Sequence, residues 1–418
     1  MLERVTQRAL VADPATAFAG SGWLRPAIAV AAIGWGANQF APLIVLYQQH
    51  GVSATATCVM FGLYAVGLIP ALIVGGRWSD RAGRHVVVVA ALLFSLAASG
   101  VLMAGSAWHG LLFPGRLLGG VSSGLAFGTG AAWIKELSAL EAHPHTGPRR
   151  ATIAMTIGFG GGPFIAGLVA QHVSRAELWP YVPQMVLAVI ALFAIRKAGT
   201  NSAGATAQKP PAQRAPADGE LSKHLILVSV PFAPWVFGTA AIALAYLPAL
   251  VAHRAGSQPL TFAAVATAIP AFAGVMVQPL VARVGPRLRI SLLAQAMVVV
   301  VVALVVAVWA ASAATVWAVF VAAAGLGAAY GIALFAGLAD VQAIADPARL
   351  GVATSAFQAV SYLGFALPYL LTLSHSRLGW SPVTGLTAVL ILAVVSAIWL
   401  GANGNRATGR REDVASAR

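Results

Sequence analysis

A short burst of charge between two long apolar segments constrains this chain most. The stretch Gly76–His85 contains three arginines and an aspartate, although only 9% of the 418 residues are charged. The apolar segments on either side, 57–75 and 86–106, each have about the 20 residues that a helix needs to cross roughly 30 Å of hydrocarbon. The sequence therefore predicts two membrane-spanning helices joined by a short cytoplasmic loop.

The composition extends this prediction to the whole chain. Hydrophobic residues make up 59% of the sequence, and the mean hydropathy is +0.82, which excludes an ordinary soluble domain. Apolar runs of spanning length occur about twelve times, so we expect an all-α integral membrane protein. The expected spans are approximately 27–49, 57–76, 86–107, 110–134, 151–171, 178–195, 225–251, 262–282, 290–311, 315–338, 351–373 and 382–401.

The basic residues decide the orientation of these spans. Of the 26 lysines and arginines, only four fall in or near loops on one side: Arg116, Arg175, Arg254 and Arg377. The positive-inside rule then predicts a multi-pass cell-membrane protein with both termini in the cytoplasm. Because the formal net charge of +14 follows the alternation of loops, we expect the lipid bilayer as the environment and no nucleic-acid partner.

No cofactor, metal or enzymatic site is expected. Cys58 is the single cysteine, so thiols cannot assemble a zinc or iron–sulfur site. His143 and His145 lie in one short loop with no third ligand nearby, which favours solvated side chains over a metal site. The sequence contains neither a His-Glu-x-x-His motif nor a nucleotide-binding Gly-x-x-x-x-Gly-Lys-Ser loop, which argues against an enzyme.

A long polar interruption divides the chain into two halves. Its Pro, Ala and polar residues predict a flexible linker. Two six-helix bundles joined by such a linker are the parallel-repeat architecture of secondary transporters, with a binding site between the halves. We expect a cytoplasmic tail, a first bundle, a cytoplasmic linker, a second bundle and a cytoplasmic tail at 1–22, 23–196, 197–223, 224–402 and 403–418.

Three motifs resemble those of the major facilitator superfamily. The first follows the pattern G-x-x-x-D-R-x-G-R between 76 and 84, and Arg116 opens a stretch that looks like R-x-x-x-G. The third, Gly158–Gly167, is similar to the G-x-x-x-G-P-x-x-G-G pattern associated with exporters and departs from it at Ala166. The resemblance implies twelve transmembrane helices in two pseudo-symmetric bundles and places the chain near the drug and metabolite exporters.

The first motif predicts a gate on the cytoplasmic side. A carboxylate beyond a helix end can accept hydrogen bonds from nearby arginines or from a helix N-terminus in the other bundle. Glycines would supply the close backbone approach that a packed loop needs. The alternative is a basic, topology-setting loop with an incidental acid. The residues assigned to this gate and to coupling are Gly76, Asp80, Arg81, Gly83, Arg84 and Glu136.

Arg116 is predicted to lie inside or at the edge of the hydrocarbon, about 9 Å into its span at 1.5 Å per residue. A charge there costs on the order of 3 kcal/mol, so a functional role is the default interpretation. The resemblance implies that Arg116 influences proton coupling or contacts an anionic substrate group. The alternative is a long side chain that snorkels to the outer interface.

The glycine-rich fifth span is predicted to seal the pathway. Glycines let neighbouring helices approach closely, and a proline removes one backbone donor and bends the helix. The resemblance implies export, whereas the alternative is ordinary packing of small residues. The residues assigned to this seal are Gly158, Gly162, Pro163 and Gly167.

Polar and aromatic side chains at helical spacing predict the substrate cavity. Such groups within spans should face the protein interior, because unsatisfied polar groups facing lipid are costly. The prediction concerns the set rather than each member: Trp35, Asn38, Gln39, Trp235, Thr239, Tyr246, Gln278, Gln358 and Tyr362.

No acidic residue is expected in the middle of a span. An exporter of cations usually needs a buried carboxylate that exchanges a proton for the charge of the substrate. Its absence favours neutral or anionic amphiphiles, and leaves Asp80, Glu136 and Arg116 as the candidates for charge relay.

We therefore expect a monomeric secondary active transporter that exports a small-molecule substrate, driven by protons or another coupling ion. Two alternatives stay open at this stage. One is an uptake permease for a small metabolite, and the other is a non-transporting, channel-like or scaffold membrane protein.

Overall fold

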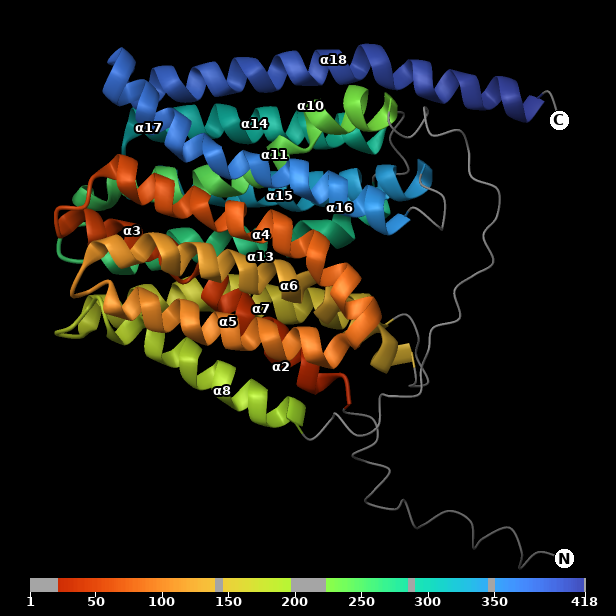
Figure 1. Cartoon of the computed structure of the whole chain (residues 1–418). Coiled ribbons are helices and arrows are strands. Elements are labelled where there is room, and N and C mark those ends of the chain that lie inside the picture. Colours follow the sequence, from red (N-terminus) through yellow and green to blue (C-terminus); the bar gives the residue numbers. More distant parts are fainter. Residues whose placement is uncertain (1–21, 140–145, 197–222, 285–289, 345–349, 417–418) are drawn as a thin grey trace, which may run out of the picture.

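The computed structural model describes residues 22–139, 146–196, 223–284, 290–344 and 350–416. Within these ranges the chain is helical almost throughout and contains no strand (Figure 1). Twelve helices in the described ranges are long and apolar enough to cross a membrane, which confirms the predicted all-α integral membrane fold. The predicted linker and N-terminal tail lie almost wholly outside the described residues. His143 and His145 also lie outside them.

Seven helices and two 3-10 turns form the first six spans. They are α2 (Leu24–Asn38), α3 (Phe40–Gln49), α4 (Ala54–Ala82), α5 (Arg84–Ala104), η1 (His109–Leu111), α6 (Leu112–Ala139), α7 (Thr146–His172), η2 (Trp179–Tyr181) and α8 (Val182–Arg196). The first span breaks at Gln39, between α2 and α3. Pro42 explains the break, because it has no backbone N–H and its ring crowds the carbonyl of Asn38.

The last six spans include four continuous helices and two interrupted ones. The continuous helices are α13 (Pro259–Val284), α14 (Leu292–Ala313), α15 (Val316–Ile344) and α18 (Pro382–Ser416). Prolines 234, 248 and 368 interrupt the other two spans, since each removes a backbone donor. Their segments are η3 (Leu225–Ser229), α10 (Val230–Phe232), α11 (Pro234–Ala241), η4 (Ile242–Tyr246), α12 (Leu247–Val251) and η5 (Ala252–Arg254), and then α16 (Leu350–Ser361), η7 (Tyr362–Ala366) and α17 (Leu367–Leu378).

The prediction of a loop between the second and third spans is wrong. α4 continues through the charged motif to Ala82, and α5 begins at Arg84. Gly83 alone separates them, with φ 89° and ψ 155°, a conformation that is essentially confined to glycine. Charged side chains are compatible with helix where it projects beyond the hydrocarbon, so apolar length alone underestimates how far α4 extends.

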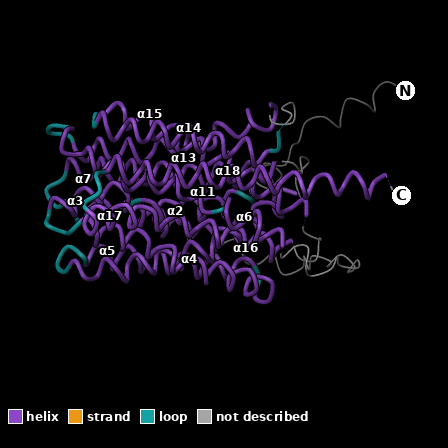
Figure 2. Tube along the Cα trace, turned by 90° about the horizontal axis from the view of Figure 1, so that it is seen from above, coloured by secondary structure: helices purple, strands orange, loops and turns teal. Residues whose placement is uncertain are grey.

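The two halves of the bundle meet along a few helices. In the first half α4 packs along α6 and α2 along α7, and in the second half α13 and α14 pack along α15. Contacts of α7 with α13 and of α4 with η7 and α17 join the halves (Figure 2). We call the side where α2 begins and α18 leaves its span the terminal side, and the opposite side the far side (Figure 1).

Candidate functional site

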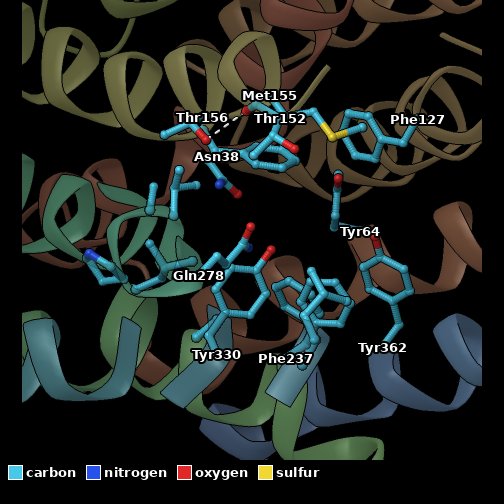
Figure 3. A pocket seen from close by; sticks show the side chains of 18 residues that line it. Asn38, Tyr64, Phe127, Thr152, Met155, Thr156, Phe237, Gln278, Tyr330 and Tyr362 are labelled. Carbon is cyan, nitrogen blue, oxygen red and sulfur yellow. Dashed lines mark hydrogen bonds between the residues drawn. The ribbon is translucent and has the colours of Figure 1, made fainter. Parts of the chain in front are cut away.

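A cavity of about 910 Å³, counting the part continuous with solvent, lies between the two halves (Figure 3). Helices α2, α4, α6 and α7 line it from the first half, and α11, η4, α13, α15 and η7 line it from the second. The lining residues are Asn38, Tyr64, Phe127, Thr152, Met155, Thr156, Phe159, Phe237, Ala240, Leu244, Pro270, Ala271, Val275, Gln278, Tyr330, Leu334, Tyr362 and Phe365.

Stacked aromatic rings form the wall that the second half contributes. The ring of Phe237 lies parallel to that of Tyr362, with centroids 4.1 Å apart and an interplanar angle of 11°. The ring centroids of Phe365 and Tyr330 lie 5.4 and 5.6 Å from that of Phe237, and Phe365 is stacked on it. Tyr64 of the first half meets Phe365 at 6.0 Å, so the aromatic surface continues across the interface between the halves.

Amide and hydroxyl groups face this wall from both halves. Figure 3 shows the side chains of Asn38 and Gln278 pointing toward one another across the cavity. Thr152 and Thr156 stand one turn apart on α7, where the Thr156 hydroxyl donates to the Thr152 carbonyl at 2.8 Å. Among the described residues, no lining side chain is a carboxylate, lysine, arginine or histidine. The cavity therefore offers aromatic faces and neutral hydrogen-bonding groups.

Only part of the predicted substrate set lines this cavity. Asn38, Gln278 and Tyr362 do. Gln39 is completely buried and donates to the Ser99 hydroxyl at 3.1 Å, in a network that stabilises α2 against α5 and α8. The remaining predicted residues, Trp35, Trp235, Thr239, Tyr246 and Gln358, are not among the lining residues.

The physical reason differs among these residues. The Thr239 hydroxyl donates to the carbonyls of Trp235 and Val236 in its own helix, at 3.0 and 3.1 Å, which is a local way to satisfy a polar group in a span. Trp235 and Tyr246 are buried in the apolar core. The polar group of such a side chain does not by itself indicate a ligand.

Sequence reasoning missed several lining residues. Tyr64 and Tyr330 are tyrosines in the middle of spans, and Thr152 and Thr156 are an i, i+4 hydroxyl pair at the start of the fifth span. Both patterns were visible as polar groups within apolar segments. Phe127, Phe159 and Phe237 carried no signal that separates a cavity wall from lipid-facing packing.

Arg116 is buried within the first half, with 1% of its surface exposed, so the snorkelling alternative is wrong. Its guanidinium donates to the carbonyls of Ala37 and Met60, at 3.1 and 3.3 Å. The Ala37 carbonyl is available because α2 ends at the next residue, which leaves the last carbonyls of the helix without intrahelical donors. Arg116 therefore joins the first, second and fourth spans.

Two aromatic rings contact this guanidinium. Its central carbon lies 4.8 Å from the ring centroids of both Phe40 and Tyr64. No ion pair joins Arg116 to an acid anywhere in the described part of the chain. Tyr64 separates Arg116 from the cavity, so a full positive charge stands directly behind one lining residue.

The charged motif forms a cluster on the terminal side of the first half. Arg84 donates to Asp80 and Glu136 at 3.2 Å and to the Ser79 hydroxyl at 2.7 Å, which ties together the ends of α4, α5 and α6. Arg81 is exposed. Among the residues that the structure describes, the hydrogen bonds and ion pairs of this cluster all lie within the first half.

The glycines of this motif do not have the predicted packing role. A Cβ at Gly76 or Gly83 would meet nothing within 4 Å, so neither glycine supports a close backbone approach. Gly83 instead supplies the positive φ that lets α5 start directly after α4.

The glycines of α7 lie against helices of both halves. A Cβ at Gly158 or Gly162 would collide with the backbone of α2 around Trp35. A Cβ at Gly167 would collide with Ala264 of α13, and one at Gly160 would lie 2.8 Å from the Phe272 ring. Pro163 lies inside the helix between these glycines. α7 is thus packed closely against its own half and against the other one.

The far side of the interface is closed by polar and apolar contacts. The Gln171 carboxamide accepts from the backbone N–H groups of Leu260 and Thr261 and donates to the Ser257 carbonyl at 3.1 Å. Cys58 and Thr372 lie 3.3 Å apart, and Phe61 packs on Phe365. By contrast, lining residues Thr152 and Gln278 belong to the ends of α7 and α13 that face the terminal side.

Comparisons with known proteins agree with this architecture. A family model described as Major Facilitator Superfamily matches residues 26–368. Multidrug resistance protein 1 of Bacillus subtilis (strain 168) is 28% identical over 146 residues, which are 35% of this chain and 37% of that protein. The chain therefore matches well under half the length of that relative.

Solved transporter structures superimpose over most of the chain. A peptide transporter POT in complex with sulfate has a TM-score of 0.69 at 11% identity, and the match covers 92% of this chain and 95% of the transporter chain. The nucleoside transporter NupG has a TM-score of 0.64 at 12% identity, and the match covers 91% of this chain and 99% of that one. A D-xylose-proton symporter has a TM-score of 0.60 at 16% identity, and the match covers 92% of this chain and 96% of that one. At these identities the likeness concerns the fold alone.

Proposed function

Since the chain belongs to the major facilitator superfamily, we propose that this transporter exports small amphiphilic compounds in exchange for protons. The observation that carries the proposal is the cavity between the halves, lined by both and separated from the far side by the contacts of Gln171 and Phe61. Rocking of two bundles about such a cavity exposes it to one side of the membrane at a time, which is alternating access.

Two observations support export over uptake. The relative from Bacillus subtilis is named as a multidrug resistance protein. In addition, the glycines of α7 bring that helix against both α2 and α13, and a helix packed on both halves is suited to sealing the pathway. Uptake of a small metabolite is the competing outcome of the test below.

The proposed orientation puts the terminal side in the cytoplasm of a cell-membrane protein. Arg77, Arg81 and Arg84 lie on that side, in accordance with the positive-inside rule. The proposed working unit is a monomer, because the two halves that line the cavity belong to one chain.

Proton coupling is assigned to Asp80, Glu136 and Arg116. Asp80 and Glu136 share the Arg84 guanidinium, so protonation of either carboxylate would weaken the cluster that ties α4 to α6. Arg116 donates to the Ala37 carbonyl at the break of the first span and to the Met60 carbonyl in the second span, so a change of its hydrogen bonds would affect helices next to the cavity.

The test is the accumulation of a neutral amphiphilic drug and of a lipophilic cation in cells with and without the protein. Each is measured before and after a protonophore. Lower accumulation that the protonophore reverses supports proton-driven export. Higher accumulation would instead establish uptake, and unchanged accumulation of both compounds would favour a non-transporting protein.

The coupling residues are tested separately by Asp80→Asn, Glu136→Gln and Arg116→Ala, with the pH gradient varied. We expect at least one of them to flatten the dependence of export on the gradient. Phe193→Ala is the control, because Phe193 lies on α8 with 62% of its surface exposed and lines no part of the cavity. An unchanged dependence in all three variants would exclude these residues from coupling.

A further inference from the structure

We propose that the cavity binds planar aromatic compounds that carry no positive charge and have a hydrogen-bonding edge. This inference rests on the proposed function, since it takes the cavity as the transport site. It specifies three features of the ligand: a flat face, an edge with donor or acceptor groups, and a neutral or negative charge. Each feature corresponds to a different part of the cavity lining.

The flat face corresponds to the aromatic wall. Phe237 and Tyr362 are parallel to within 11°, and Phe365 is inclined to Phe237 by 27°. Three rings in similar planes present a stack that another planar ring can extend, and offset stacking is a favoured geometry of aromatic pairs. A branched aliphatic compound would gain the burial of apolar surface but not this stacking.

The hydrogen-bonding edge corresponds to Asn38 and Gln278. Each carboxamide provides two donors and one acceptor oxygen. Within the described residues, neither side chain forms a hydrogen bond to the protein, although both line the cavity. They face one another across it (Figure 3), so a ligand lying on the aromatic wall brings its edge between two available amides.

The charge preference follows from Arg116. Its guanidinium stands 4.8 Å behind the ring of Tyr64, and it has no acidic partner among the described residues. A positive charge in a low-dielectric interior acts over distances of several ångströms. Because no described lining residue is an acid, no side chain of that lining offsets the field for a cationic ligand.

The aromatic rings do not reverse this preference. A cation over a ring face is attracted by the ring quadrupole, but the face of Tyr64 nearest the first half is already occupied by Arg116. The stack of Phe237 and Tyr362 can be extended by a neutral ring or by a cationic ring, so the stack does not select between them and the charge of Arg116 decides. The cavity is thus suited to a neutral ring system and disfavours a cationic ring of the same shape.

The experiment compares three compounds that share the fused three-ring skeleton of acridine and differ in charge and in the groups on its edge: neutral acridone, the cation N-methylacridinium and the anion acridine-9-carboxylate. Binding to the purified full-length protein is measured by equilibrium dialysis without any ion gradient. We expect acridone to bind at least about tenfold more tightly than N-methylacridinium, and the carboxylate to bind more tightly than the cation. Equal or tighter binding of the cation would overturn the inference.

Variants locate the binding in this cavity. Phe237→Ala and Gln278→Leu should each weaken acridone binding by about three- to tenfold, the range expected for one aromatic stack or one hydrogen bond. Phe193→Ala is the control and should leave binding unchanged. Unchanged binding in both cavity variants, with thermal unfolding like that of the parent, would also overturn the inference.

An added negative charge separates electrostatics from shape and hydrogen bonding. Asn38→Asp puts a carboxylate on the cavity lining, so it should raise the affinity for N-methylacridinium and lower that for acridine-9-carboxylate. If this variant does not fold, Thr156→Asp tests the same point from α7. A variant that folds and does not change the relative affinities of the two ions would contradict an electrostatic origin of the preference.

Failure of the inference is distinguishable from failure of the proposed function. Acridone binding with the expected preference, without proton-driven export from cells, would overturn the proposed function and support the ligand class. Proton-driven export of N-methylacridinium in preference to acridone would support the proposed function and overturn the ligand class.

Discussion

Arg116 is a buried guanidinium held by two backbone carbonyls and two aromatic rings, in a region where a charge is expensive. The break of the first span after Asn38 creates one of its acceptors, and Pro42 causes that break. Arg116 therefore depends on an interruption elsewhere in the chain. The placement explains why the charge belongs to arginine in particular, since two carbonyls from different helices require two well-separated N–H donors.

Arg116→Lys tests this dependence. Lysine keeps the charge but has a single ammonium group that cannot reach both carbonyls in the same geometry or stack between Phe40 and Tyr64. We expect the rate of transport to fall by about tenfold or more, equivalent to about 1.4 kcal/mol. The measurement is initial export rate at equal amounts of folded protein in the membrane. A rate equal to that of the parent would show that charge alone suffices.

Gly83→Ala tests the single residue that separates α4 from α5. Gly83 has φ 89° and ψ 155°, where a side chain costs about 1–3 kcal/mol. We expect a lower midpoint of thermal unfolding in detergent. Gly76→Ala is the control, because Gly76 is helical and a Cβ there meets nothing within 4 Å. A helical Gly→Ala change should be neutral or stabilising by up to about 1 kcal/mol, so equal destabilisation of both variants would contradict this account.

At the scale of elements, α7 is the helix on which both halves depend. Successive glycines on it serve different neighbours: Gly158 and Gly162 face α2, and Gly160 and Gly167 face α13. A helix with small residues on two faces can pack closely on both sides. Such packing matters in lipid, because no hydrophobic driving force brings the helices together there. The pattern of glycines was visible in the sequence, but the division of the faces required the neighbours.

Gly158→Ala should separate α7 from α2. A Cβ at this position would lie 2.9 Å from the Trp35 nitrogen and nearer still to the Ala31 carbonyl, so backbone rather than a flexible side chain would have to move. Such overpacking costs about 1–3 kcal/mol, measurable as a lower midpoint of thermal unfolding. Gly161→Ala is the matched control three residues along α7, where a Cβ meets nothing within 4 Å. Loss of stability in the control as well would point to backbone flexibility instead.

The spans could be predicted from the sequence because hydropathy is a local property. The ends of the helices were harder to predict. α4 continues through Asp80 and Arg81, because polar residues outside the hydrocarbon do not end a helix. The cavity was predictable only in part. Asn38 and Gln39 are adjacent amides, yet one lines the cavity and the other is buried against Ser99. Faces toward lipid and toward neighbouring helices are both apolar, so amphipathicity cannot distinguish them.

At the scale of the whole molecule, the two halves meet on the far side. The clearest device is Gln171, whose carboxamide accepts from the N–H groups of Leu260 and Thr261 at 3.0 and 3.4 Å. These are orphan donors in the first turn of α13, so a side chain of one half caps a helix of the other. The described structure is thus the state in which the far side is closed and the cavity lies toward the terminal side. Alternating access requires that this cap be released in every cycle.

A cross-link across the cap should therefore stop transport. In a Cys58→Ser background, Gln171→Cys and Thr261→Cys are combined and joined with a short, reductively cleavable bifunctional thiol reagent. We expect export to fall to the background level and to return after cleavage, because the halves can no longer part on the far side. The control joins His50→Cys to Glu177→Cys; the parent side chains contact one another on the far side within the first half, so this cross-link leaves the interface free to open. Export at the parent rate with the first cross-link complete would mean that the far side does not open during transport, and would overturn the alternating-access mechanism for this chain.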